Sequence, residues 1–498
     1  MNRDAKIAWW AAAAALLFHT LANPHYGFFR DELYFIICGR RPDWGYVDQP
    51  PLVPLLAAAT QMFGQSLFLL RFEAAIFAAA AVFVTCRLVQ QFGGAAFAQV
   101  FAALCVALSP VLVALGMKVG TDMPGLWLWP LGVLCIVRAL DGRPRYWLGA
   151  GLAFGCAFES KYSILFVIVA IVVGLLVARE WRTFATPWFW AGAGLGVAIA
   201  LPNAVWQAAH GFPMAELLRN GQAGKNVVLG PFQFVLAELF ITIPLLSLVW
   251  LAGLVWLFLQ ARLRWIGYAY LALLVMMIAF HAKHYYPADI YPVLFAAGAV
   301  ALERWTAART LIRPVFFALA VPAGLVLLPL VEPILPIDTF IAYRQALPLP
   351  DTSTENQRRR PKVQQDWADM FGWPELVATV AKVYDGLPAP DRAKAAIFAD
   401  NYGEAAALDF FGGRYGLPPA LSGHNQYFLW GPRGYDGSIL IRVGGDEAGL
   451  RRRCASLQRA AVFEHPLVMP FESDLPIFVC RGLKPPLPQI WPLVKFYY

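Results

Sequence analysis

Charged residues are scarce in this sequence: aspartate, glutamate, lysine and arginine together make up 14% of its 498 residues. Soluble globular chains carry about 25% charged residues. Hydrophobic residues reach 59%, and the mean hydropathy is +0.55. These values exclude a disordered chain, a fibre and a soluble enzyme. They indicate an α-helical membrane protein that crosses the bilayer many times.

Cysteine is also rare, with 7 residues in the chain, which is too few for a disulfide framework. Cys454 and Cys480 are the only cysteines near the C-terminus, and a disulfide between them is permitted if that region lies in an oxidising compartment. Glycine-rich nucleotide motifs and zinc-ligand spacings are missing as well. We therefore expect no nucleotide cofactor. The net charge of +8 does not indicate a nucleic-acid partner in a membrane protein, where basic residues must first be sorted by side.

Apolar runs long enough to span a membrane recur through the first two thirds of the chain. A spanning helix needs about 20 apolar residues. The runs predict about eleven transmembrane segments, one of them a short half-helix at 148–160. The segments lie near 7–23, 66–86, 95–115, 122–139, 148–160, 162–178, 186–206, 233–259, 266–281, 288–302 and 315–331.

The basic residues of the short loops predict the orientation. Threading eleven segments from a cytoplasmic N-terminus keeps thirteen basic residues on one side, and cytoplasmic loops are enriched in lysine and arginine. This arrangement places the C-terminal part on the outer side, which predicts a bacterial inner-membrane protein with a periplasmic C-terminal domain. The thirteen residues are Arg3, Lys6, Arg87, Arg138, Arg143, Arg145, Arg179, Arg182, Arg262, Arg264, Arg304, Arg309 and Arg313.

The composition changes after the last span, and this change predicts three parts. Residues 1–335 form a transmembrane domain, residues 336–362 a polar linker and residues 363–498 an outer α/β domain. In the outer domain we expect helices over 364–383 and from Asp400 to about 411. A further helix is predicted near 446–459. Strands are predicted at 395–399, 419–422, 438–443, 461–464 and 476–480.

The first outer loop carries an acidic pair, Asp31 and Glu32, directly after the first span. A carboxylate at this position can act as a general base that activates an acceptor hydroxyl, amine or phosphate. It can equally be a solvated loop end or an acidic cap on an interfacial helix. The loop continues to Asp48-Gln49-Pro50-Pro51-Leu52.

An Asp-Glu pair after the first span, followed by an acid, one residue and Pro-Pro-Leu, resembles bacterial glycosyltransferases of the GT-C superfold. The branch with protein O-mannosyltransferases and the lipid A aminoarabinose transferase is the most similar. The resemblance implies transfer of a sugar from a polyprenyl-phosphate carrier, with inversion in a single displacement. It also implies that Asp31 is the catalytic aspartate with Glu32 as its companion, and that Asp48 helps to hold a divalent ion. Where this chain has Gln49, the aminoarabinose transferases have a lysine that contacts the carrier phosphate.

Three further outer loops supply polar residues that the resemblance connects with the same site. Asp122 resembles a second acidic site, although Asp122 and Pro124 also suit a simple helix start. The cations expected to bind the donor phosphate are Lys118, Lys161, Lys283 and His284. Lys161 could instead pair with Glu159.

Aromatic residues of these loops are candidates for a sugar or prenyl path, or for an interfacial aromatic belt. They are Tyr46, Tyr285, Tyr286 and Tyr291. A divalent cation (Mg²⁺, Mn²⁺ or Zn²⁺) held by Asp48 and Glu32, with His281 and His284 nearby, is a further possibility.

Three functions are compatible with these features. The first is a glycosyltransferase whose donor is a polyprenyl-phosphate sugar and whose acceptor is lipid A, lipopolysaccharide, another glycan or a protein. The second is a transporter or flippase for a lipid-linked anion, which predicts inverted repeats and polar residues at mid-span; we find neither in the sequence. The third is a membrane-anchored binding protein, which leaves the acidic first loop without a role. Membrane lipids are partners in every case.

Overall fold

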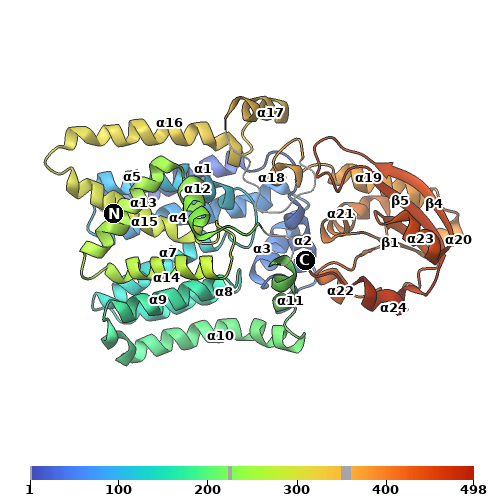
Figure 1. The fold of residues 1–498 in the computed structure, drawn as a ribbon, viewed down its shortest axis with the longest axis horizontal. Coiled ribbons are helices and arrows are strands. Elements are labelled where there is room, and N and C mark those ends of the chain that lie inside the picture. Colours follow the sequence, from blue (N-terminus) through green and yellow to red (C-terminus); the bar gives the residue numbers. More distant parts are fainter. Residues whose placement is uncertain (1–2, 223–226, 349–360) are drawn as a thin grey trace.

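The computed structural model describes residues 3–222, 227–348 and 361–498. Figure 1 shows a bundle of helices next to a smaller domain built around a sheet. We call the described residues up to 348 the helical domain and residues 361–498 the sheet domain. The end of the bundle that faces the sheet domain is called the sheet-domain end.

Each expected span has a helical counterpart. The helices are α1 (Arg3–Ala22), α4 (Leu67–Gln91), α5 (Ala96–Leu108), α6 (Pro110–Gly116), α7 (Gly125–Leu140), α8 (Tyr146–Phe158), α9 (Ile164–Val177), α10 (Pro187–Ala209), α12 (Pro231–Ile241), α13 (Pro244–Leu259), α14 (Arg264–Ala279), α15 (Tyr291–Trp305) and α16 (Arg313–Val331). Within the described ranges, four of them are long and apolar enough to cross a membrane, namely α1, α4, α10 and α16. Six spans result if the bent pairs α5–α6 (69°) and α12–α13 (107°) each count as one. The total of eleven stays a prediction.

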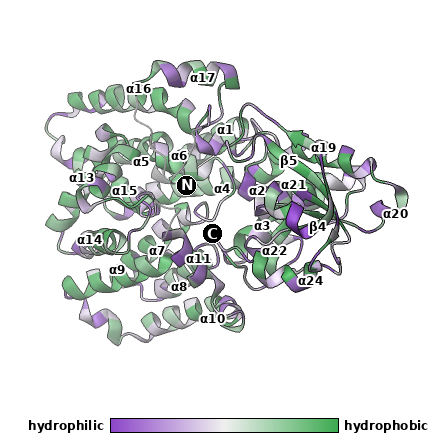
Figure 2. Cartoon of the chain, turned by 45° about the vertical axis from the view of Figure 1, so that its right-hand side comes forward, coloured by the Kyte–Doolittle hydropathy of each residue, from purple (hydrophilic) through white to green (hydrophobic). Residues whose placement is uncertain are grey.

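Helix α15 forms the centre of the bundle. Its residues from Tyr291 to Ala301 are all buried, and it packs against α4, α5 and α13. Apolar side chains on α10 and α16 remain exposed, as expected for surfaces that face lipid. Figure 2 shows that hydrophobic residues dominate the bundle helices. The chain is thus a multi-pass membrane protein in composition and in architecture.

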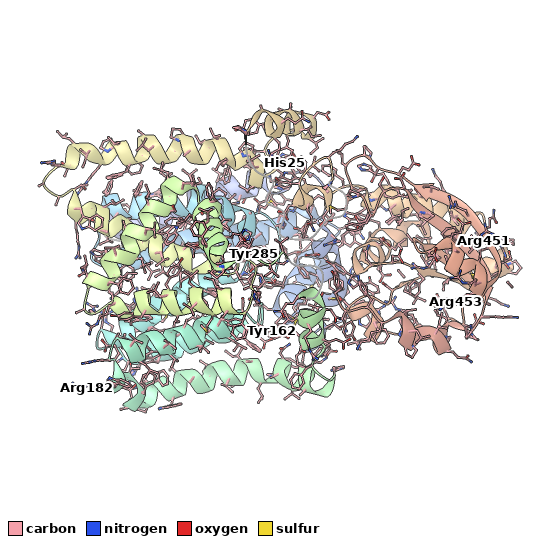
Figure 3. The ribbon with its side chains drawn as sticks, viewed as in Figure 1. His25, Tyr162, Arg182, Tyr285, Arg451 and Arg453 are labelled. Carbon is pink, nitrogen blue, oxygen red and sulfur yellow. A yellow bond between two sulfur atoms is a disulfide. The ribbon has the colours of Figure 1, made fainter. Side chains whose placement is uncertain are left out.

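Basic residues gather at the end of the bundle away from the sheet domain, where Figure 3 labels Arg182. Arg262 forms an ion pair with Asp141, and Arg304 donates to the carbonyl of Phe92 at 3.1 Å. The first contact joins the loops after α7 and α13, and the second joins the last turn of α15 to the loop after α4. The clustering agrees with the shared side that the charge pattern predicts.

The sheet domain contains a five-stranded sheet of order β2-β1-β3-β5-β4. Strands β2, β1 and β3 run parallel, whereas β5 is antiparallel to both β3 and β4. The strands are β1 (Ala395–Phe398), β2 (Ala420–Leu421), β3 (Ile439–Val443), β4 (Cys454–Phe463) and β5 (Leu475–Leu483). The helices are α18 (Gln365–Ala368), α19 (Trp373–Asp385), α20 (Ala389–Arg392), α21 (Tyr402–Phe411), α22 (Gln426–Leu429), α23 (Glu447–Arg453) and α24 (Leu487–Ile490). This small α/β domain has the class that the sequence predicts.

One expectation about this region is wrong, and a second segment contains a helix that was not expected. The helix expected over 446–459 ends at Arg453, and the chain continues as β4, whose residues pair with the long strand β5. The linker expected over 336–362 contains a helix, α17 (Ile337–Ala346), whose Phe340 packs on Trp367. Residues 349–360 of that linker lie outside the described residues.

The bundle has a hydrophobic core of its own, and a second hydrophobic cluster joins the sheet domain to the first outer loop. Helices α2 (Arg30–Gly39) and α3 (Leu52–Thr60) of the first loop pack together, and α2 lies on α21. Leu33, Ile36 and Val53 are fully buried in the same cluster as Ile397 and Ile441 of the sheet. The remaining loop helix is α11 (Pro213–Asn220). The first outer loop of the helical domain is therefore packed firmly against the sheet domain.

Cys454 and Cys480 form a disulfide between the neighbouring strands β4 and β5, with Cα atoms 5.6 Å apart. The five free cysteines all lie in the helical domain.

Candidate active site at the sheet-domain end

The polar residues of the outer loops gather where the bundle meets the sheet domain. Figure 3 labels Tyr162 and Tyr285 at this end of the helices. Backbone and side-chain contacts connect the loops: the Leu52 N–H donates to the Glu159 carbonyl at 2.9 Å, and Asn203 bridges the Tyr162 hydroxyl and the Trp44 carbonyl. The first loop is therefore tied to the α8–α9 turn and to α10.

Asp31 lies in the first turn of α2 and keeps a partly exposed carboxylate. The Tyr402 hydroxyl of the sheet domain donates to Asp31 Oδ1 at 2.6 Å, and Arg30 Nε lies 3.6 Å from the same oxygen. Burial raises the pKa of Tyr402 well above its ordinary value, so this hydroxyl stays protonated as a donor. The Asp31 side chain is 35% exposed, and the structure gives its Oδ2 no hydrogen bond to any described residue. Asp31 is thus oriented through one oxygen and accessible through the other.

Asp48 is the second carboxylate that the sheet domain holds. Its Oδ1 accepts from the Tyr34 hydroxyl at 2.9 Å, and its Oδ2 accepts from Asn425 Nδ2 at 3.0 Å. Burial raises the pKa of Asp48 to about 6, and the charge of Asp31 adds to this rise. The two carboxylates therefore lie within electrostatic reach of each other.

Glu32 does not belong to this accessible site, which corrects the expected catalytic and metal-binding roles. Its side chain and that of Arg71 are both fully buried, and Arg71 Nε and Nη2 donate to the two carboxylate oxygens at 3.1 and 3.0 Å. The backbone N–H groups of Phe29 and Val119 donate to the same oxygens. Glu32 thus has four donors and acts as a structural clamp for the first loop.

The expected divalent-cation site does not assemble from these residues. The Glu32 oxygens already accept from Arg71 and two backbone N–H groups, and those of Asp48 accept from Tyr34 and Asn425. In the described part of the chain, no three His, Cys, Asp or Glu side chains converge as metal ligands. The donor set around Asp48 and Glu32 therefore does not fit a cation shared between them.

Asp122 and Lys161 form an ion pair, with Lys161 Nζ 2.5 Å from Asp122 Oδ1. The ammonium group also lies 4.1 Å from the ring centroid of Tyr286. Burial alone would lower the pKa of Lys161, but Asp122, together with Tyr286 and Asp289, raises that pKa on balance. The alternative pair of Lys161 with Glu159 does not form. This cationic group stays charged at neutral pH.

Asp289 is a further acid at this ion pair, and no role was expected for it. Its carboxyl is 3% exposed, and a Cβ at Gly125 would lie 2.1 Å from Asp289 Oδ2, so only glycine fits at the start of α7. In the sequence, Asp289 is marked only by its position two residues before Tyr291-Pro292 in the last outer loop.

The other expected phosphate ligands fall into two groups. Lys283 and His284 are half-buried in the loop before α15, beside Tyr285. Burial and the charge of Lys283 lower the pKa of His284, so its imidazole is neutral at pH 7. Lys118 instead forms an ion pair with Asp366 and lies over the Phe29 ring. Lys118 thus connects the helical domain to the sheet domain.

Tyr46 and Tyr291 were expected to line a substrate path, but both side chains are completely buried and do not face the site. The Tyr46 hydroxyl donates to the Cys38 carbonyl at 2.9 Å, which closes the first loop on itself. Tyr291 packs on Trp250 in the centre of the bundle and donates to Glu238. Tyr285 and Tyr286 remain half-exposed around Lys161.

Nothing in the sequence indicates which residues of the sheet domain contact Asp31 and Asp48. Tyr402 lies 371 residues from Asp31, and Asn425 lies 377 residues from Asp48. The run from Asp400 to Ala405 stands out in the sequence, yet it does not reveal which loop it contacts.

Known proteins share both sequence and fold with this chain. Residues 48–206 match the family model for dolichyl-phosphate-mannose-protein mannosyltransferase. The chain is 26% identical over 186 residues to the lipid A galacturonosyltransferase RgtD of Rhizobium johnstonii. That alignment covers 37% of this chain and 39% of the relative, so the chain matches well under half of the relative's length.

The fold is similar to that of ArnT from Cupriavidus metallidurans in its solved complex with undecaprenyl phosphate. The TM-score is 0.62 at 14% identity, and the match covers 94% of this chain and 97% of the other. The apo state of the same protein matches with a TM-score of 0.61 over the same shares. At this identity the likeness shows the fold. The matches confirm the resemblance to GT-C type glycosyltransferases that the first outer loop indicated, and the chain has the ArnT-like GT-C fold.

Proposed function

We propose that this chain is a membrane glycosyltransferase that moves a sugar from a polyprenyl-phosphate carrier to lipid A or another glycan acceptor. The fold match to a protein solved with undecaprenyl phosphate supports the carrier class. The partial match to a lipid A galacturonosyltransferase supports a lipid A or glycan acceptor. The identity of the sugar is left open.

The observation that carries the proposal is the state of Asp31. A general base must be ionised, oriented and accessible to the proton that it removes. Tyr402 and Arg30 contact one oxygen of Asp31, while about a third of the side chain is exposed. Its neighbour Glu32, by contrast, is fully enclosed by Arg71. Of the adjacent acids, only Asp31 can meet a substrate.

In the proposed reaction, the acceptor hydroxyl gives its proton to Asp31 Oδ2 as its oxygen attacks the anomeric carbon of the donor sugar. The bond from that carbon to the phosphate oxygen breaks, and the phosphate leaves with the bonding electrons. A new glycosidic bond forms on the opposite face of the ring. The attack is a single displacement, so the configuration at the anomeric carbon inverts.

The leaving phosphate needs positive charge near the lipid surface. Lys161 supplies a point charge that Asp122 keeps protonated. Lys283 follows in the neighbouring loop, and the neutral imidazole of His284 can donate one hydrogen bond. We assign these three residues to the phosphate, and we assign Tyr285 and Tyr286 to the adjoining sugar.

We propose the bacterial inner membrane as the location, with the sheet domain in the periplasm. The clustering of arginines at the opposite end of the bundle supports this orientation, because basic loops stay in the cytoplasm.

The test compares Asp31→Asn with the wild type for sugar transfer and for donor binding. Loss of a general base lowers turnover by about 10²- to 10⁴-fold. Donor binding, measured as undecaprenyl phosphate retained on the purified protein in native mass spectra, should stay unchanged. Asp43→Asn is the matched control, because Asp43 lies in the same loop and its exposed carboxylate accepts from the backbone N–H of the neighbouring Trp44. Equal turnover of Asp31→Asn and wild type would refute the assignment.

A further inference from the structure

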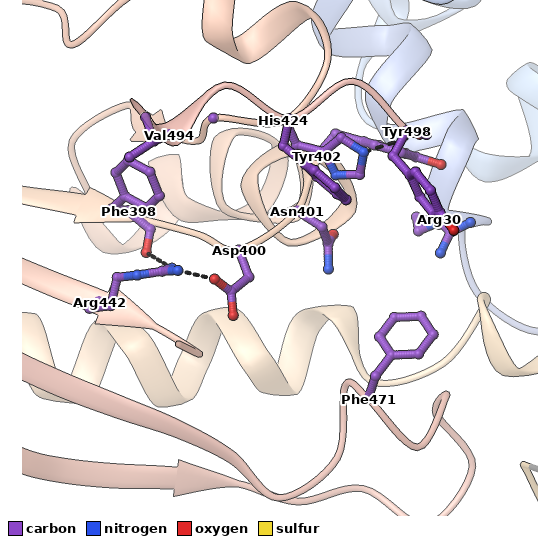
Figure 4. Close-up of a pocket in the computed structure, with 12 residues that line it drawn as sticks. Arg30, Phe398, Asp400, Asn401, Tyr402, His424, Arg442, Phe471, Val494 and Tyr498 are labelled. Carbon is purple, nitrogen blue, oxygen red and sulfur yellow. Dashed lines mark hydrogen bonds and ion pairs between the residues drawn. The ribbon is translucent and has the colours of Figure 1, made fainter. Parts of the chain in front are cut away.

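A cavity of about 600 Å³ opens in the sheet domain next to the first outer loop (Figure 4). Its volume falls within the range of about 300–1,000 Å³ that is typical of ligand sites. None of its residues was expected to bind the carrier phosphate. The proposed reaction uses neither its aromatic residues nor its polar ones, apart from the contacts of Tyr402 and Arg30 with Asp31.

The cavity lies where the parallel strands end. Asp400 and Asn401 follow β1, His424 follows β2, and Arg442 lies near the end of β3. Ligands of open α/β sheets bind at the carboxyl ends of the strands. Gly444 has a φ of +73°, and a Cβ there would lie 2.2 Å from Asp400 Oδ2, so the turn after β3 needs glycine to leave room for this carboxylate.

The walls combine aromatic faces with planar polar groups. Phe398, Tyr402, Phe471 and Phe496 contribute rings, and Phe471 and Phe496 are 55% and 48% exposed. Arg442 pairs with Asp400, whose side chain is 40% exposed, so the carboxylate still faces solvent. Aromatic faces cover the apolar C–H face of a pyranose ring, and carboxylate and guanidinium groups bond its neighbouring hydroxyls. This combination matches a sugar better than an acyl chain, which would need no polar wall.

The cavity adjoins Asp31 through two shared residues. Tyr402 forms part of the cavity wall and donates to Asp31 Oδ1, and Arg30 lines the cavity while its Nε lies 3.6 Å from the same carboxylate. The Arg30 Nε is buried and makes no hydrogen bond within the described residues. A glycan seated in the cavity would therefore lie beside the two residues that contact Asp31.

We propose that this cavity binds a sugar ring of the acceptor glycan and thereby presents the acceptor hydroxyl to Asp31. The inference rests on the proposed function, since it names where the acceptor of that reaction is held. The proposal assigns the two substrates to separate places: the donor phosphate lies among the helix ends, and the acceptor sugar lies on the sheet domain.

Phe471→Ala tests the proposal in transfer assays with lipid A as the acceptor. Loss of one stacked ring should raise the KM for lipid A about three- to tenfold, while the KM for the donor stays unchanged. Phe471→Trp should restore the wild-type value, because it keeps an aromatic face. The matched control is Tyr415→Ala, which removes a partly exposed ring of the same domain outside the cavity. Unfolding midpoints of all variants should agree.

A second readout does not need turnover. The glucosamine disaccharide of deacylated lipid A should show saturation-transfer NMR signals with the wild-type protein and weaker signals with Phe471→Ala. A rise in the donor KM, or equal effects of Phe471→Ala and Tyr415→Ala, would overturn the acceptor site. If no donor is turned over but the disaccharide binds in a Phe471-dependent way, the reaction is refuted and the sugar site stands.

Discussion

Replacing Glu32 by glutamine should lower the free energy of unfolding, because Glu32 has a structural role although it lies next to the proposed base Asp31. Its carboxylate forms a fully buried ion pair with Arg71 and accepts two backbone N–H bonds. Removing one partner of a buried pair costs about 3–5 kcal/mol, because the other charge stays buried without compensation. Arg71 would lose the charge of its ion-pair partner and keep neutral acceptors, namely the carbonyls of Asn23, His25 and Gly27 and the amide oxygen of the new side chain.

The assay is denaturant unfolding in detergent micelles, followed by tryptophan fluorescence, with Asp31→Asn as the adjacent control. The partly exposed Asp31 should change the free energy of unfolding by less than about 1 kcal/mol. The double variant Glu32→Gln with Arg71→Met should recover part of the loss, since it removes the unpaired charge as well. If Glu32→Gln unfolded like the wild type yet lost turnover, the structural role of Glu32 would be refuted.

Three further variants probe the phosphate site, the buried acid and the sheet. Lys161→Met should raise the KM for the polyprenyl-phosphate donor about tenfold or more in steady-state assays, and an unchanged KM would exclude Lys161 from the phosphate site. Asp48→Asn should be more stable relative to the wild type at pH 8 than at pH 4. The pKa of Asp48 is about 6 in the folded state and lower in the unfolded state, so the wild type loses stability as the pH rises through 6, whereas asparagine does not titrate. A difference in unfolding midpoint between variant and wild type that is the same at both pH values would contradict this. Cys454→Ser should lower the stability of the sheet domain by about 2–5 kcal/mol, because the disulfide to Cys480 closes a loop of 26 residues. Resistance to protease equal to that of the wild type would argue against this.

The helical framework was predictable because lipid-facing spans leave a strong signal in composition. The positions of the bundle helices and the α/β class of the C-terminal domain follow from apolar runs and from the change in composition after 340. The prediction of a helix over 446–459 was wrong because residues Cys454 to Phe463 pair with β5, and pairing with a distant strand overrides the local helix preference.

The site was predictable at the level of loops and not at the level of contacts. Asp31 and Asp48 were identified as candidates, yet what distinguishes both from Glu32 is their contact with Tyr402 and Asn425 of the sheet domain. Adjacent acids look alike in a sequence, whereas their burial depends on which helix face meets Arg71. Tyr291 was expected to line a substrate path, but it begins helix α15 with a fully buried side chain and donates to Glu238. No role was expected for Glu238, which lies inside an apolar run.

The most direct test is a mass measurement on lipid A after incubation with proteoliposomes that contain the purified protein and a labelled undecaprenyl-phosphate sugar. The account predicts that lipid A gains the mass of one sugar residue with the wild type and gains none with Asp31→Asn. A labelled carrier that crosses the bilayer of sealed vesicles, while lipid A keeps its mass with every donor sugar, would contradict the account and identify a transporter instead.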